Sequence, residues 1–76
     1  MVTKFSRIQA FYYKLLEKIE QMTLEYDPEE KLILLDDISD IAYFLHKQIK
    51  SYTPESELET IKIQKMLVKI KEYCNV

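Results

Sequence analysis

Two prolines and a complete lack of glycine constrain the fold of this chain more than any other feature. Pro28 and Pro54 divide its 76 residues into thirds. A β-rich domain of this size would need glycine at its tight turns. Because the residue before a proline avoids the α region, helices are expected to end at Asp27 and Thr53. The sequence therefore predicts long helices joined by few, short connections.

Each third of the chain shows the apolar periodicity of an amphipathic helix. Short connections make neighbouring helices antiparallel. We therefore predict one all-α domain, residues 1–76, folded as a three-helix up-down-up antiparallel bundle with helices over about 3–25, 28–51 and 54–74. The residues expected to face its core are Phe5, Ile8, Tyr12, Leu15, Ile19, Met22, Tyr26, Leu34, Leu35, Ile38, Ile41, Ala42, Leu45, Ile49, Tyr52, Ile63, Met66, Leu67, Ile70, Tyr73 and Cys74.

Capping signals mark the expected helix starts. Asp27 can cap a helix that has Pro28 at its first position, with Glu30 at the capping-box position. Thr53 repeats this pattern before Pro54. For the first helix, a start at Thr3 and a start at Ser6 both remain open.

Charged residues are placed in agreement with this topology. In an up-down-up bundle the acidic start of the second helix, Glu29 and Glu30, is expected near the basic end of the third, Lys69 and Lys71. The opposite arrangement would bring like charges together.

Composition narrows the classes of function. With 11 basic and 13 acidic residues the net charge is −2, whereas duplex-binding domains usually carry a basic excess. The single cysteine, Cys74, cannot form an internal disulfide and fits a reducing compartment. We find no apolar run of membrane-spanning length and no signal-peptide pattern, so a cytoplasmic location is expected.

The residues that catalysis would need are sparse. His46 and Cys74, the only residues of their kinds, are expected on different helices and several turns apart, which disfavours a Cys–His nucleophile pair. The segment from His46 to Ser51 loosely resembles the phosphoacceptor helix of histidine phosphotransfer and kinase dimerisation domains. However, it lacks the small residue near the histidine, and Pro54 lies too far along. A histidine at the edge of the core is the preferred interpretation.

Two groups of charged residues have several interpretations. Asp36, Asp37 and Asp40 form an acidic group that suits a solvated face or a docking patch for a basic partner better than a metal site. Lys62, Lys65 and Lys69 form a stripe that suits a solvated face better than a phosphate contact.

More apolar residues are present than one core needs. Leu32 and Tyr43 lie on the back of the second helix, Ile33 and Phe44 lie on its flank with Asp37 and Asp40 between them, and Ile61 and Val68 lie off the core face of the third. In a three-helix bundle each helix faces two neighbours, so Ile33 and Phe44 can also belong to a wide core arc, whereas Leu32 and Tyr43 cannot. A contiguous exposed apolar patch there would mark a contact site. The candidate partner-binding residues are therefore Leu32, Ile33, Asp37, Asp40, Tyr43 and Phe44.

These observations predict a small non-enzymatic interaction or regulatory protein. We expect it to bind a protein partner or a second copy of itself, without a cofactor, a metal or a small-molecule substrate. Two alternatives remain. One is a role similar to that of bacteriocin-immunity bundles, based on size and architecture. The other is a nucleic-acid-binding helical hairpin that resembles small plasmid-copy-control proteins and would use the lysine stripe.

Overall fold

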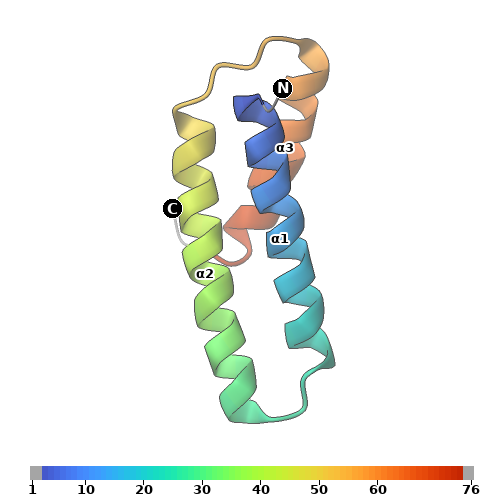
Figure 1. The fold of residues 1–76 in the computed structure, drawn as a ribbon, viewed down its shortest axis with the longest axis vertical. Helices are drawn as coiled ribbons and strands as arrows, with labels where there is room; N and C mark the ends of the chain where they lie inside the picture. Colours follow the sequence, from blue (N-terminus) through green and yellow to red (C-terminus); the bar gives the residue numbers. More distant parts are fainter. Residues whose placement is uncertain (1–2, 75–76) are drawn as a thin grey trace.

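The structure, a computed structural model that describes residues 3–74, is an all-α fold of three helices (Figure 1). These are α1 (Lys4–Leu24), α2 (Pro28–Lys50) and α3 (Glu57–Lys71). The helix α2 runs antiparallel to α1 and packs against it along most of its length, and α3 runs back beside both. The predicted up-down-up bundle is therefore confirmed.

The second helix begins where the sequence predicts, and the first begins at one of the two positions that the sequence left open. The Thr3 hydroxyl accepts a hydrogen bond from the Ser6 backbone N–H (3.0 Å), and the Ser6 hydroxyl accepts one from the Thr3 N–H (3.0 Å). This reciprocal capping box places the start of α1 at Thr3 and not at Ser6. The carboxylate of Asp27 caps α2 by accepting from the Glu29 N–H at 3.0 Å, with Pro28 at the first helical position.

The third helix begins later than predicted. Ser56, not Thr53, is its N-cap and accepts a hydrogen bond from the Glu59 N–H at 3.2 Å. The Glu59 carboxylate also accepts from the Glu55 N–H (3.0 Å) and from the Tyr52 hydroxyl. These bonds hold residues 52–56 as an ordered connection, so the expected start at residue 54 was wrong. The expected end at residue 74 was also too late, since α3 ends at Lys71.

Because α3 is short, it covers only part of the other two helices. Its 15 residues make a rod of about 22 Å, whereas the 23 residues of α2 make one of about 34 Å. The hydroxyl of Ser39 donates a hydrogen bond to the backbone carbonyl of Tyr73 (3.2 Å), so the chain after α3 reaches the middle of α2 and not its start. Lys69 and Lys71 consequently lie well away from Glu30, and the charge pairing predicted between these helix ends was wrong.

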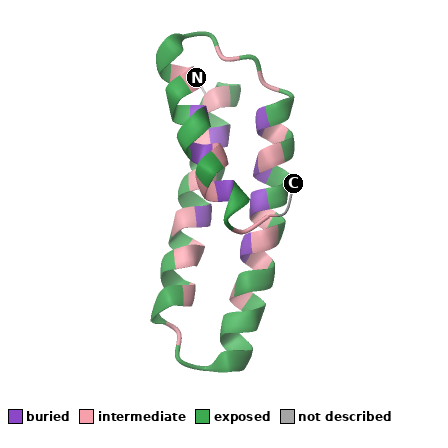
Figure 2. Cartoon of the chain, turned by 180° about the vertical axis from the view of Figure 1, so that it is seen from behind, coloured by how far each residue is buried: buried purple, intermediate pink, exposed green. Residues whose placement is uncertain are grey.

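The molecule thus has two unlike halves. We call residues 3–15 and 38–74 the three-helix half, and residues 16–37 the two-helix half. Figure 2 shows α3 in front of the upper part of the bundle only, with no helix in front of the lower part. Among the described residues, every buried side chain belongs to the three-helix half. They are Ile8, Leu15, Ile38, Ala42, Leu45, Ile49, Ile63, Met66 and Ile70.

Expected core residues in the two-helix half are only partly enclosed. Ile19, Met22 and Leu34 are half-buried. Leu35 is 39% exposed and Tyr26 is 95% exposed, so the prediction that both face the core was wrong. Tyr26 lies beyond the end of α1, and Leu35 lies on the side of α2 that a longer third helix would have covered.

Candidate functional site

The six candidate residues occupy two faces of α2. At 100° per residue, Ile33, Asp37, Asp40 and Phe44 fall on the flank toward α1, while Leu32 and Tyr43 fall on the outer side. The apolar members are exposed, with exposed fractions of 67% for Leu32, 56% for Ile33, 50% for Tyr43 and 43% for Phe44. Asp37 is half-buried and Asp40 is exposed. The flank and the outer side are separate surfaces.

On the outer side the two apolar residues do not meet. Leu32 and Tyr43 are 11 residues apart, which separates them by about 16 Å along the helix. The ammonium of Lys47 lies 5.1 Å from the centre of the Tyr43 ring, a cation–π distance, and covers part of that ring. The outer side therefore holds two isolated apolar side chains rather than one patch.

On the flank, Phe44 is paired with an aromatic residue of the neighbouring helix. Its ring centre lies 5.0 Å from that of Phe11 of α1, with an angle of 65° between the ring planes, an edge-to-face contact. Phe11 is itself 37% exposed. The pair holds α1 and α2 together at this point and still presents apolar ring surface to solvent.

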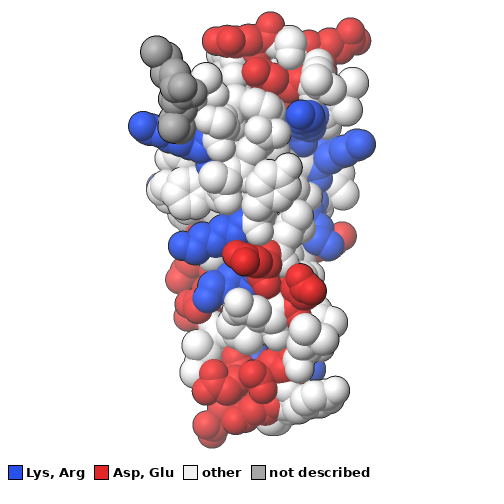
Figure 3. All heavy atoms as spheres, turned by 45° about the vertical axis from the view of Figure 1, so that its right-hand side comes forward, with Lys and Arg blue, Asp and Glu red and all other residues white. Residues whose placement is uncertain are grey.

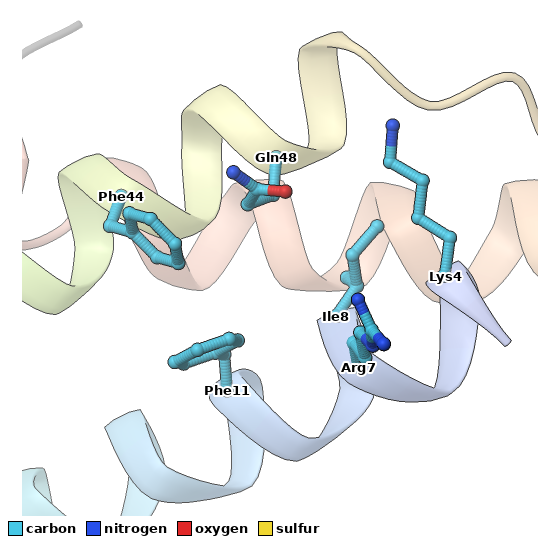
Figure 4. Close-up of a pocket in the computed structure, with 6 residues that line it drawn as sticks. All are labelled: Lys4, Arg7, Ile8, Phe11, Phe44 and Gln48. Carbon is cyan, nitrogen blue, oxygen red and sulfur yellow. The ribbon is translucent and has the colours of Figure 1, made fainter. Parts of the chain in front are cut away.

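A groove runs along this flank on both sides of the aromatic pair. One hollow of about 430 Å³ lies toward the start of α1, and a second of about 320 Å³ lies on the other side of the pair. We call the two together the aromatic groove. Its lining residues are Lys4, Arg7, Ile8, Phe11, Lys14, Asp40, Ile41, Phe44 and Gln48. Figure 4 shows Phe11 and Phe44 pointing toward one another from opposite walls, with Lys4 and Arg7 on the α1 side.

Charges of opposite sign border the aromatic groove. Arg7 and Lys14 belong to α1, whereas Asp40 belongs to α2. Lys4 donates hydrogen bonds to the carbonyl (3.1 Å) and the hydroxyl (3.2 Å) of Ser51, which fixes the end of the groove. Within residues 3–74 no ion pair joins Lys14 to Asp40, and the only ion pair there links Lys69 to Glu72 at 3.4 Å. The charges of Lys14 and Asp40 are therefore available to a bound molecule.

Sequence reasoning overlooked the α1 wall of this groove. None of the candidate residues predicted from the sequence lies on this wall, so Arg7, Phe11 and Lys14 were missed. Phe11 lies four residues before Leu15 and three after Ile8, both of them core residues. That spacing is typical of a residue facing the core, so only the packing of α1 on α2 shows that its ring stays exposed.

Other reactive or charged residues lie apart from the aromatic groove. Partial burial, together with the positive charges of Lys50 and Lys71, lowers the pKa of His46. Cys74 follows Tyr73, whose carbonyl contacts Ser39, two turns of α2 from His46. No hydrogen bond among the described residues joins His46 to Cys74.

The lysine stripe of α3, Lys62, Lys65 and Lys69, does not form an uninterrupted basic surface. Lys62 and Lys65 line a small hollow with Gln9, Tyr12 and Tyr13 of α1. Lys69 is paired with Glu72. On the face drawn in Figure 3, acidic side chains gather at both ends of the molecule, and lysine and arginine side chains lie between them together with further acidic ones.

Comparisons of this chain with protein-family models, with curated proteins and with solved structures found no match. Two further features of residues 3–74 complete the description. None of their three helices combines the length and the apolarity that a bilayer crossing requires. They contain no cluster of three or more His, Cys, Asp or Glu residues in a metal-binding arrangement.

Proposed function

We propose that this chain is a non-enzymatic helical protein that acts in the cytoplasm by binding a protein partner in its aromatic groove. The observation that carries the proposal is the Phe11–Phe44 pair, two aromatic rings from two helices that remain exposed at the centre of a hollowed surface. Exposed aromatic residues beside a pocket are common centres of binding energy in protein interfaces.

The shape and chemistry of the aromatic groove suit an amphipathic segment of the partner. Two antiparallel helices form its walls, and a helix can place side chains spaced three or four residues apart on either side of the rings. Arg7 and Lys14 would contact acidic residues at one edge of that segment, and Asp40 a basic residue at the other.

The test compares two neighbouring aromatic residues of α2. Phe44→Glu places a carboxylate in the groove, whereas Tyr43→Glu places one on the outer side of the same helix. Tagged wild-type protein and both variants would be used to capture partners from the source cell, with identification by mass spectrometry. Binding of each captured protein would then be measured with purified components.

We expect Phe44→Glu to weaken binding by about 2 kcal/mol or more, the magnitude typical of a central interface residue. Tyr43→Glu should leave binding within about 0.5 kcal/mol of the wild type, and both variants should keep their helical circular dichroism. If Phe44→Glu binds the purified partner as tightly as the wild type does, the aromatic groove is not the binding site. A stronger effect of Tyr43→Glu would move the site to the outer side.

A further inference from the structure

The structure assigns a second interface, on the face opposite the aromatic groove: the outer side of α3 docks onto the two-helix half of a second copy of this chain. α3 ends partway along the other two helices and leaves one side of their hairpin uncovered, which we call the step. Beside Ser39, the hairpin of α1 and α2 continues without a third helix (Figure 2). A two-fold axis at this step would place the α3 of each copy over the uncovered hairpin of the other.

The step presents apolar side chains. Leu35 lies one turn of α2 before Ser39 and continues the face that α3 covers higher up. It is 39% exposed, and Leu16 and Ile19 of α1 are only half-buried. These side chains occupy the position that a longer third helix would have enclosed.

The outer side of α3 presents a matching apolar stripe. Leu58, Ile61 and Val68 are 61%, 46% and 66% exposed, and they fall within about 80° of one another around the helix. Leu58 and Val68 are 10 residues apart, a span of about 15 Å. The part of α2 before Ser39, residues 28–38, is about 16 Å long. The stripe and the step therefore have the same length.

The proposed two-fold axis brings specific residues to the same level. Val68 lies five residues before Tyr73, and Leu35 lies four residues before Ser39, so Val68 of one copy is level with Leu35 of the other. Lys62 lies 11 residues before Tyr73, and Glu29 lies 10 residues before Ser39, so Lys62 of one copy is level with Glu29 of the other.

Charge supports this pairing. The two-helix half, residues 16–37, contains eight acidic and two basic residues, a net charge of −6. Residues 57–74 contain four basic and three acidic residues, and the acidic Glu57 and Glu59 lie in the first turn of α3. The lysine-bearing remainder of α3 would therefore lie against the acidic part of the second copy.

The area required is modest. A stable interface removes about 600 Å² or more from each partner. That is about a tenth of the 5623 Å² surface of the described chain. The dimer would contain two equivalent contacts, in each of which the stripe of one copy lies on the step of the other. The buried area is therefore divided between two contacts.

The experiment measures the mass of the full chain in solution by sedimentation velocity, over concentrations up to about 1 mM. The wild type should form a dimer. Leu35→Glu and Val68→Lys should each raise the dissociation constant by about a hundredfold, because each would bury a charge against apolar side chains. Leu24→Glu, a change at a residue that is 68% exposed and lies off the step, should dimerise like the wild type.

The double variant Leu35→Glu/Val68→Lys is the decisive measurement. It sets opposite charges at the same level across both contacts and should regain most of the dimer that each single variant loses. A wild type that stays monomeric, a Leu35→Glu variant that dimerises normally, or a double variant that stays monomeric overturns the proposal. Phe44→Glu should dimerise normally, so failure of this interface and failure of the aromatic groove are distinguishable.

Discussion

The two halves of this molecule are built from the same kinds of residues but are packed differently. In the three-helix half, Leu15, Leu45 and Ile70 are 0% exposed, because three helices surround them. In the two-helix half, side chains on the same core-facing side of α1, such as Ile19 and Met22, are only half-buried. An amphipathic pattern therefore determines which way a side chain points, but the number of neighbouring helices determines how far it is buried.

The connections at the two ends of the molecule also differ, in the hydrogen bonds that hold them. The connection between α2 and α3 is held by side-chain bonds to two helices: Lys4 of α1 donates to Ser51, and Tyr52 donates to Glu59 of α3. The connection between α1 and α2 is held by local bonds, in which the Glu25 carboxylate accepts from the N–H groups of Tyr26 and Asp27. We expect the end of the molecule with only local bonds to open more readily.

The largest expected difference between the halves is in the free energy of unfolding on truncation of a leucine of α2. Leu45→Ala removes a fully buried side chain from the three-helix half and should cost about 2–5 kcal/mol. Leu35→Ala, at a 39% exposed position in the two-helix half, should cost about 1 kcal/mol or less. Urea unfolding followed by circular dichroism, in dilute solution where the chain is monomeric, measures both.

Equal losses for these two variants would contradict the division into two halves. A Leu45→Ala variant that is unfolded even without denaturant would agree with the prediction, because a chain of this size has a small free energy of unfolding.

A smaller difference in the free energy of unfolding is expected between changes at the observed N-cap of α3, Ser56, and at the predicted N-cap, Thr53. Ser56→Ala removes the hydroxyl that accepts from the Glu59 N–H and should cost about 1 kcal/mol. Thr53→Ala alters an exposed residue outside the helix and should change the stability by less than about 0.5 kcal/mol. Asp27→Ala, at the cap of α2, should resemble Ser56→Ala. Thermal unfolding of the three variants tests this order, and a larger effect at Thr53 would mean that α3 starts earlier than residue 57.

The smallest effect is a pH dependence at the connection between α2 and α3. The Tyr52 hydroxyl donates a hydrogen bond to Glu59, which raises the pKa of Tyr52 from 10.0 to about 12 and lowers the pKa of Glu59 below 4.5. Stabilisation from the raised tyrosine pKa is present below pH 10 and is lost as the pH rises through about 12. Stabilisation from the lowered carboxyl pKa is present above pH 4.5 and is lost as the pH falls.

Tyr52→Phe removes this hydrogen bond and leaves the ring in place. The wild type should therefore be slightly more stable than Tyr52→Phe near neutral pH, and the difference should shrink in both acid and strong alkali. Urea midpoints at several pH values measure it. A difference that is independent of pH would show that the Tyr52 ring, and not its hydroxyl, stabilises this end.

Parts of the candidate site followed from the sequence. The exposure of Leu32 and Tyr43 was predicted, because both lie off the core arc of α2 and that arc depends only on the spacing of apolar residues. For Ile33 and Phe44, packing against a neighbouring helix remained open, and the structure shows both of them exposed. The division of these residues between two faces of α2 was predicted for the same reason. The role of this surface in binding a partner stays a prediction.

The sequence by itself determined the number of helices, their antiparallel order and the cap at Asp27, because these depend on local hydrogen bonds, on proline sterics and on apolar periodicity. For the first helix it left two starts open, at Thr3 and at Ser6. Only the tertiary structure decided that α3 stops beside Ser39, that Phe11 joins Phe44 to form the aromatic groove, and that Leu35 stays exposed. Those outcomes depend on how far one helix extends beside another, and periodicity within a single helix carries no information about that distance.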